Sequence, residues 1–239
     1  MISRIEENEY GFTSVWSNMT NLECGLFFVN PNLPNDIFFD KLTNITCLNE
    51  KMIDDVLILF KKNNTQPFVY VLNNNKLEEL LLKKNFRLYD THHIMKKTIS
   101  HTVNHEPVHH IARKDSLLWA EVFCKSYDCL DWSDEVNSIV HDSISDVEYL
   151  VDSEFNSSCV ALYEKNSMLG LYCLGTIPEF RNKGLAKSLI YYALNKVREK
   201  NLDFLMLETY ARDNLLRFYS NLGFEQIYEK KYTLFEFRK

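Results

Sequence analysis

The segment from residue 174 to residue 186 constrains the fold more than any other part of the chain. It reads Leu-Gly-Thr-Ile-Pro-Glu-Phe-Arg-Asn-Lys-Gly-Leu-Ala, so the end of an apolar strand runs into a turn with glycine and then into an amphipathic helix. The first backbone N–H groups of a helix have no partner within it, and the helix dipole is positive there. The segment therefore predicts an anion-binding loop that suits a pyrophosphate.

The residues after this loop predict a helix, a strand and a second, shorter helix. Apolar residues at positions 185, 189, 190, 193, 194 and 197 form one helical face of the kind that packs on a sheet. Phe204-Leu-Met-Leu207 is a short apolar run, typical of a strand buried on both faces. In the segment 214–224, Asp213 or Asn214 can cap a short helix, and Gly223 suits its left-handed end.

These segments resemble two motifs of the GCN5-related N-acetyltransferase (GNAT) family. Arg181-x-x-Gly184-x-Ala186, with a proline three residues before the arginine, is similar to motif A, whose loop binds acetyl-CoA. Asn214, Tyr219 and the Gly223-Phe224 pair are similar to motif B, except that Leu216 or a neighbour replaces the usual alanine. The two motifs follow in the family's order, about thirty residues apart. The resemblance covers roughly residues 108–239.

The resemblance implies a layered α/β (α+β) fold with a mixed, mostly antiparallel central sheet flanked by helices. It implies acetyl-CoA as the acyl donor, with no metal, and Tyr219 as the catalytic residue that protonates the departing thiolate. Gly175 and Thr176 would offer main-chain groups to the pantetheine arm and the thioester carbonyl, and Asn214 would bind the arm or brace the gap between strands. The full set of implied cofactor-binding residues is Leu174, Gly175, Thr176, Arg181, Asn182, Lys183, Gly184, Leu185, Ala186 and Asn214.

An internal echo predicts two tandem GNAT-like domains. The stretch 67–95 has the order strand, short helix, Asn85-Phe86, strand, which repeats the order at 203–237. Residues 52–60 predict a helix in the position of the loop-following helix, but the preceding 41–49 contain neither glycine nor arginine. We expect a degenerate domain at 1–100 that binds no CoA, a linker at 101–107 and an acyltransferase domain at 108–239. Any α/β domain could produce such an echo.

Acidic residues concentrate between positions 115 and 154, a segment that contains eleven Asp and Glu residues and one basic residue, Lys125. Nucleic acid and an anionic membrane surface are poor partners for this segment, because binding phosphates requires basic residues. Helices are predicted at 117–127 and 133–140. The loop between them, Asp128-Cys-Leu-Asp-Trp132, could bind an ammonium through its carboxylates and through a cation–π contact with its aromatic ring. The segment thus predicts a small cationic amine as acceptor, against the alternative of a solvated acidic face. It does not indicate the oligomeric state.

The activity implied is direct transfer of an acetyl group to a primary amine. Spacing does not choose the general base among Glu148, Asp131, Glu135 and Glu208. The alternative for Tyr219 is a purely structural aromatic core residue. Two alternatives remain open: transfer of a longer acyl group or transfer to an amino acid, as in the glycine N-acyltransferase and mycothiol synthase types, and a CoA-binding assembly module without turnover.

The cysteine and histidine patterns predict no covalent or metal cross-link. The cysteines at 24, 47, 124, 129, 159 and 173 show no Cys-x-x-Cys spacing, so we expect six free thiols in a reducing compartment, the cytoplasm. His101, His105 and His109 are spaced by four, but Pro107 disfavours the helix that would align them on a metal. The acidic N-terminus does not look like a signal peptide, and no stretch reaches the ~20 apolar residues of a membrane span.

Overall fold

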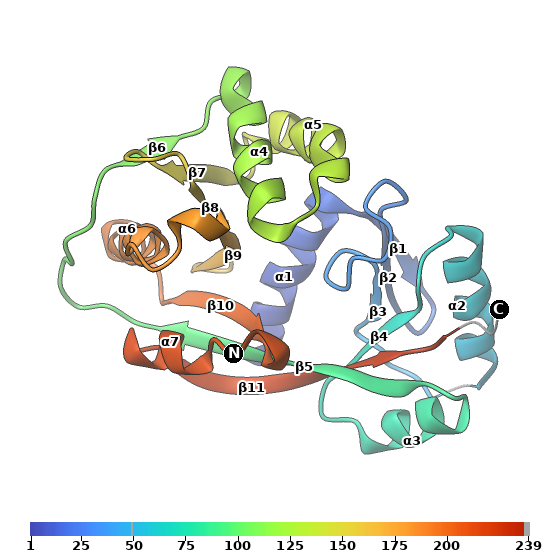
Figure 1. Ribbon diagram of the computed structural model, residues 1–239. Coiled ribbons are helices and arrows are strands. Elements are labelled where there is room, and N and C mark those ends of the chain that lie inside the picture. Colours follow the sequence, from blue (N-terminus) through green and yellow to red (C-terminus); the bar gives the residue numbers. More distant parts are fainter. Residues whose placement is uncertain (49, 237–239) are drawn as a thin grey trace. The chain divides into compact units, whose positions relative to one another are not determined.

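The computed structural model describes residues 1–48 and 50–236 and has the expected α/β architecture (Figure 1). The chain forms two compact units: unit 1 comprises Met1–Phe12 and Met95–Glu208, and unit 2 comprises Thr13–Ile94 and Thr209–Lys239. Three elements contribute to both units, namely α1 (Ile2–Trp16), β5 (Arg87–Lys97) and β10 (Leu205–Tyr210). Each unit is described by itself below.

Unit 1 contains a mixed sheet in the order β10-β9-β8-β7-β6. Strands β6 to β9 pair antiparallel, whereas β9 and β10 are parallel, and α4 and α6 pack against the sheet. The expected helices at 117–127, 133–140 and 185–197 are all present. The elements are β6 (Val108–His110), α4 (Ser116–Tyr127), α5 (Ser133–Ser143), β7 (Glu148–Asp152), β8 (Ser158–Lys165), β9 (Met168–Thr176) and α6 (Leu185–Glu199), with short 3-10 turns η1 (Arg113–Asp115), η2 (Leu130–Trp132) and η3 (Pro178–Phe180).

Unit 2 contains strands in the order β1-β2-β3-β4-β11-β5. One face of the sheet carries a core of Val, Leu, Ile and Phe side chains, onto which α2 and α3 bring their apolar residues. The elements are β1 (Asn18–Leu22), β2 (Gly25–Val29), β3 (Lys41–Thr43), α2 (Glu50–Lys62), β4 (Phe68–Val71), α3 (Asn75–Lys83), η4 (Ala211–Asp213), α7 (Leu216–Asn221) and β11 (Glu225–Leu234).

The internal echo of the sequence is present in the local structure. β3-α2-β4 and β9-α6-β10 are both strand-helix-strand units whose strands are parallel. α3 and α7 then end in the same way: Asn85 and Gly223 adopt left-handed φ angles of 65° and 83°. The next residues, Phe86 and Phe224, are buried and donate their backbone N–H to the carbonyl five residues earlier. The repeated pattern in the sequence thus corresponds to repeated backbone geometry.

The two compact units interleave along the chain, whereas the boundaries expected from the sequence are linear. Within unit 2, the C-terminal strand β11 lies between β4 and β5 and pairs antiparallel with β4, from Lys231 opposite Val71 to Leu234 opposite Phe68. Strand β11, which belongs to the C-terminal half of the sequence, is therefore part of the same sheet as β4 of the N-terminal half. The predicted division into a domain at 1–100, a linker at 101–107 and a domain at 108–239 stays a prediction.

The expected linker is held against α6. Residues 101–107 have no regular secondary structure apart from bends. The buried Asn195 amide of α6 donates to the Val103 carbonyl at 2.7 Å and accepts from the Val103 N–H at 2.9 Å. The N–H of Glu106 donates to the Ser188 hydroxyl at 2.7 Å. This segment is therefore hydrogen-bonded to α6 at Val103 and Glu106, although its residues other than Val103 are exposed.

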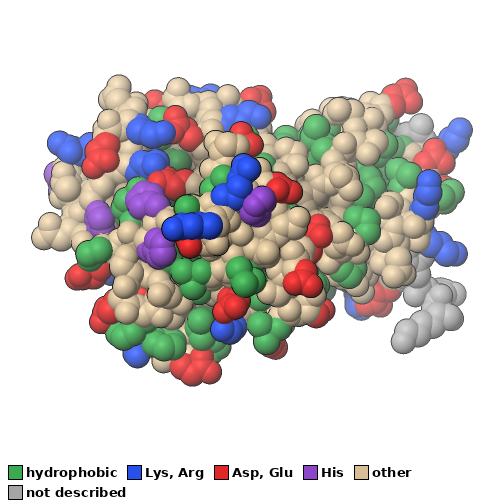
Figure 2. Space-filling model, turned by 90° about the horizontal axis from the view of Figure 1, so that it is seen from above, with side chains coloured by type: hydrophobic (Ala, Val, Ile, Leu, Met, Phe, Trp, Pro, Cys, Tyr) green, Lys and Arg blue, Asp and Glu red, His purple; other side chains and the backbone are tan. Residues whose placement is uncertain are grey.

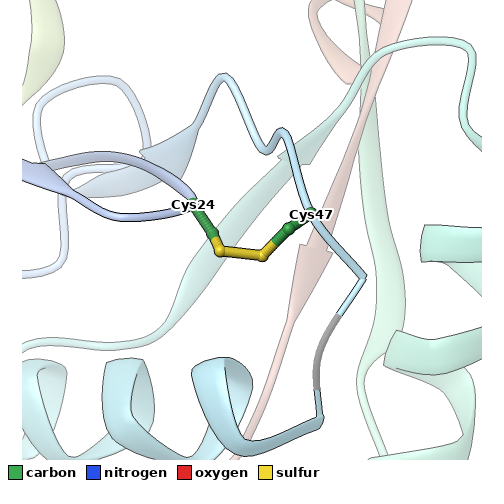
Figure 3. The surroundings of a disulfide bond; sticks show 2 residues. All are labelled: Cys24 and Cys47. Carbon is green, nitrogen blue, oxygen red and sulfur yellow. A yellow bond between two sulfur atoms is a disulfide. The ribbon is translucent and has the colours of Figure 1, made fainter.

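The expectation of six free thiols is wrong for two cysteines. Cys24, in the turn between β1 and β2, forms a disulfide with Cys47, which follows β3 (Figure 3). The pairing of β2 with β3 brings the two cysteines together across 23 residues of sequence. The other four cysteines form no disulfide; Cys159 is fully buried in β8, and Cys173 in β9 is only partly buried. Among the described residues, no helix is both long and apolar enough to cross a membrane.

Candidate functional site

The C-terminal end of β9 departs from regular pairing on both sides. On the β8 side, Cys159 pairs with Gly175 and Ala161 with Tyr172, so β9 carries one extra residue, and Cys173 has a φ of +54°. This is a β-bulge, a feature often found beside active sites because it redirects the strand. On the β10 side, the register ends at Leu171 opposite Leu207. Residues 172–176 thus extend beyond the last residue paired with β10.

The carbonyl groups of the three predicted residues at this strand end are each engaged by the protein. The Tyr127 hydroxyl donates to Leu174, the Ser158 hydroxyl to Gly175 at 2.8 Å, and Nε of Arg181 to Thr176 at 3.1 Å. A thioester carbonyl is polarised by backbone N–H donors. The three bonds described here involve the C=O groups of these residues and not their N–H groups. The strand end is therefore fixed in position before any ligand is present.

Gly175 also allows α4 to approach β9 closely. A Cβ atom at this position would lie 2.7 Å from the Ser126 Cβ and 2.9 Å from the Tyr127 Cε2. Any larger residue would have to displace the end of α4. The glycine is thus required by packing, in addition to the cofactor role that the resemblance implies.

Arg181 braces the loop between β9 and α6. Besides its bond to Thr176, its guanidinium donates to the backbone carbonyl of Ser126 at the end of α4, at 3.2 Å. A further bond, from the Ile177 N–H to the Ser157 carbonyl at 2.8 Å, ties the loop to the turn between β7 and β8. The arginine of the motif therefore acts on the loop's shape through backbone carbonyls.

Gly184 is the N-cap of α6 and adopts a left-handed backbone conformation, which favours glycine at this position of the motif. Its φ is +86°, and a Cβ atom built there would meet nothing within 4 Å. The first turn of α6 contains no acidic residue, whereas α2 begins with Glu50. Open space above a glycine at the positive end of a helix fits a phosphate group. The N-terminus of α6 at Gly184 therefore has the geometry and the absence of negative charge that an anion requires.

The two predicted residues of motif B lie in unit 2. Asn214 does not cap α7: it ends η4 in the left-handed conformation, with a φ of 55°, and Leu215 precedes the helix. Tyr219 lies on α7 and is only 5% exposed. Burial, and to a smaller extent the Asp213 carboxylate, raise the pKa of the Tyr219 phenol above its ordinary value. The phenol is therefore protonated over the whole physiological pH range.

The four candidate bases have different surroundings. The Glu148 carboxylate is 2.5 Å from the Lys196 ammonium, 3.2 Å from His110 and accepts a 3.0 Å bond from the Tyr192 hydroxyl. It is thus committed to structural contacts. Asp131 is exposed in η2, Glu135 is half-buried on α5, and Glu208, which follows the last β10 residue paired with β9, has both carboxylate oxygens buried.

Several carboxylates of the acidic segment have local structural roles. The buried Asp152 accepts hydrogen bonds from the N–H groups of Phe155, Ser157 and Ser158, each at 2.7 Å, and so closes the turn after β7. Glu121 pairs with Lys125 on α4. The negative charge of this segment is therefore partly a consequence of turn and helix chemistry.

Near the C-terminal end of α6 lies a polar cavity that the sequence did not indicate. Its volume is about 350 Å³, and its charged lining includes Glu148, Glu164, Lys196 and Lys200, which form two ion pairs. His110 also lines it. Figure 2 shows histidine side chains gathered on one part of the surface, among interspersed acidic and basic groups. In the described part of the chain, no group of three or more His, Cys, Asp or Glu side chains could hold a metal ion.

Comparison with known proteins identifies part of the chain. Residues 147–224 match the model of the acetyltransferase (GNAT) family. A search of curated proteins finds no match. Solved structures match over most of the chain at low identity, which shows that the fold is shared.

A GCN5-related N-acetyltransferase from Kribbella flavida has a TM-score of 0.69 and 11% identity, over 98% of this chain and 95% of its own. Another GCN5-related N-acetyltransferase, from Sphaerobacter thermophilus, has a TM-score of 0.64 and 10% identity, over 100% of this chain and 91% of its own. A conserved protein of unknown function from Staphylococcus epidermidis has a TM-score of 0.65 and 13% identity, over 92% of this chain and 94% of its own. The family match shows that the chain carries a domain of the acetyltransferase (GNAT) family at residues 147–224, and the solved structures show the shared fold alone.

Proposed function

We propose that this protein transfers an acetyl group from acetyl-CoA to a primary amine of a small, cationic acceptor by direct attack. The observation that carries the proposal is the loop before α6. Gly184 has a left-handed φ with open space above it, at the N-terminus of a helix without acidic residues in its first turn. That arrangement fits a pyrophosphate, and the GNAT family domain covers it.

Unit 1 supplies the groups that would hold the donor. Asn182, Lys183 and Gly184 bring the loop's backbone to the pyrophosphate, and Leu185 and Ala186 contribute N–H groups from the first turn of α6. The pantetheine arm carries amide groups, which can pair with the β9 residues that extend beyond the β10 register. When bound, acetyl-CoA supplies an activated thioester.

The acceptor, which binds as an ammonium, first loses one proton through water. The neutral amine then attacks the thioester carbonyl, a C–N bond forms and the C–S bond breaks. The amine loses one proton to a base, and the thiolate gains one from an acid. We assign the acid to Tyr219, whose raised pKa keeps its hydroxyl protonated. We assign the base to Glu208, because it stands where β10 leaves its pairing with β9.

The acceptor side is assigned to the loop after α4. Asp131 is exposed there, and Tyr127 and Leu130 expose large apolar surfaces beside it. An ammonium with an apolar body is attracted to such a combination of carboxylates and rings. This assignment gives the acceptor's class and not its identity.

An amine panel tests the proposal. Release of free CoA thiol from acetyl-CoA is followed with polyamines, amino acids and amino sugars, alongside longer acyl-CoA donors, and donor binding is followed by thermal shift. Amine-dependent thiol release with the cationic members supports the proposal. Preference for a longer acyl group or for an amino acid favours the alternative transferase, and donor binding without thiol release favours a binding module. A chain that neither binds nor turns over acetyl-CoA contradicts the proposal altogether.

A further inference from the structure

The polar cavity of unit 1 lies near the end of α6 that is opposite Gly184. Lys196 and Lys200 are one helical turn apart there, and each pairs with a carboxylate of the sheet below: Glu148 of β7 and Glu164 of β8, both at 2.5 Å. Two ion pairs thus lie side by side in a cavity of about 350 Å³. Small-molecule sites begin at about this size, since they occupy about 300–1,000 Å³.

The two ammonium groups keep hydrogen-bonding capacity that the protein does not use. A lysine ammonium has three N–H donors. Among the described residues, Lys196 and Lys200 each form one ion pair, and Lys196 also lies 6.0 Å from the centroid of the Tyr192 ring. Two N–H groups on each lysine therefore remain for an acceptor. Side chains one turn apart are close enough for a single carboxylate to accept from both.

The carboxylates that line the cavity differ in how fully they are engaged. Glu148 is held by Lys196, by His110 and by the Tyr192 hydroxyl, so it fixes the position of Lys196. Asp146 is exposed in the turn before β7, and its printed side-chain contact is one long hydrogen bond of 3.4 Å from the Ser145 hydroxyl. Asp146 is therefore the carboxylate of the lining that can best receive a cation.

We propose that this cavity binds a free α-amino acid with an aliphatic side chain. The carboxylate of the amino acid lies between Lys196 and Lys200, and its ammonium lies at Asp146. Its side chain packs against Ile144, a half-buried residue of the same lining. An anion without a cationic group would meet the acidic residues unpaired, and a cation without an anionic group would meet the two lysines, so the mixed lining favours a zwitterion. The site is separate from the Gly184 loop and does not depend on the function proposed above.

Calorimetry with L-leucine and two truncated analogues tests the proposal on the unmodified protein. 4-Methylpentanoate lacks the ammonium and 3-methylbutylamine lacks the carboxylate, but both keep the aliphatic chain. We expect saturable leucine binding in the millimolar range or tighter, and about a tenfold loss of affinity for each analogue, the size of one charge-assisted hydrogen bond. Absence of saturable leucine binding, or equal affinity for leucine and either analogue, overturns the inference.

Two substitutions locate the effect. Lys200→Met should weaken leucine binding about tenfold without weakening that of 3-methylbutylamine, and Asp146→Asn should weaken leucine binding without weakening that of 4-methylpentanoate. The control for the lysine is Lys125→Met, because Lys125 also forms one ion pair, with Glu121, and its side chain is 48% exposed, as is that of Lys200. Asp142→Asn, at an exposed position of α5 outside the cavity lining, is the control for the carboxylate. If either variant weakens leucine and its matching analogue by the same factor, or if the controls weaken leucine binding as much, the assignment is wrong.

Discussion

The guanidinium of Arg181 donates a hydrogen bond to the backbone carbonyl of Ser126, and this single contact joins the loop before α6 to the last turn of α4. Its Nε bonds the Thr176 carbonyl as well, so one side chain connects the strand end, the loop and the helix. The planar fork of arginine suits this task, because it can reach two carbonyls in fixed directions. The loop is thus shaped in advance of binding.

Loss of this brace should weaken donor binding more than it weakens the fold. Arg181→Ala is expected to lower acetyl-CoA affinity about tenfold while reducing the free energy of unfolding by about 1 kcal/mol. Arg181→Lys should be intermediate, since one ammonium cannot span both carbonyls. Calorimetry and thermal unfolding measure the two effects, with Arg113→Ala as the exposed control. Unchanged affinity in a folded Arg181→Ala variant would show that the loop keeps its shape without the arginine.

Two substitutions at Gly184 separate backbone strain from loss of the anion site. Both Gly184→Ala and Gly184→Glu place a Cβ at a φ of +86°, which costs about 1–2 kcal/mol of stability. Because the space there is open, neither change should cause a clash within the protein. Only Glu adds a carboxylate where we expect the pyrophosphate, so acetyl-CoA binding should be lost in Gly184→Glu and merely reduced in Gly184→Ala. Binding of one donor per chain is expected, and equal affinity of the two variants contradicts the pyrophosphate assignment.

Asp40 should make unit 2 more stable in mild acid. Burial raises the pKa of this carboxyl to about 6, although its oxygens accept bonds from the N–H groups of Asn30 and Asn35 and from the Thr65 hydroxyl. A raised pKa contributes stability that is fully present below the unfolded-state pKa of about 3.9 and is lost as pH rises through about 6. The free energy of unfolding should therefore increase by about 1 kcal/mol from pH 7 to pH 5.

Denaturant unfolding across this range measures that effect, and Asp40→Asn is the control. The variant has no proton to take up at this site, so its stability should depend less on pH than that of the parent. It should also be less stable at every pH, because an amide nitrogen would face N–H donors. Identical pH dependence of parent and variant would show that Asp40 does not titrate between pH 5 and pH 7.

Tyr219→Phe should lower kcat about a hundredfold and leave acetyl-CoA affinity nearly unchanged. The substitution keeps the buried ring and removes only the hydroxyl that we assign to protonation of the thiolate. Since the pKa of this phenol is raised, its ionisation should not reduce the parent's rate below about pH 10. Stopped-flow and steady-state rates at several pH values test this, with Tyr191→Phe as the control. Equal turnover of Tyr219→Phe and the parent would make Tyr219 a packing residue.

The parts of the fold that were predictable are those encoded by local patterns. The apolar face of α6 and the glycine at position 184 act within one turn of chain, so their periodicity and φ requirement can be read directly. The repeated helix ends at Asn85 and Gly223 were visible for the same reason.

What could not be predicted depends on pairing between distant segments. Strand β11 lies between β4 and β5 in the sheet. The apolar pattern of a strand does not determine which strands pair with it, because several pairings would bury the same side chains. The Cys24–Cys47 disulfide depends on the β2-β3 register, which no Cys spacing reveals. The polar cavity needs α6 and the strands of unit 1 in fixed positions, and the charged residues that line it are scattered along the sequence.

Transfer of an isotopically labelled acetyl group tests the central claim most directly. Labelled acetyl-CoA is incubated with the protein and the best amine of the panel, and both the free CoA thiol and the acylated amine are quantified by mass spectrometry. The account predicts one labelled acetyl group on the amine nitrogen for each thiol released, and loss of both products in Gly184→Glu. Thiol release without a labelled amine, or the same yield from Gly184→Glu as from the parent, would contradict it.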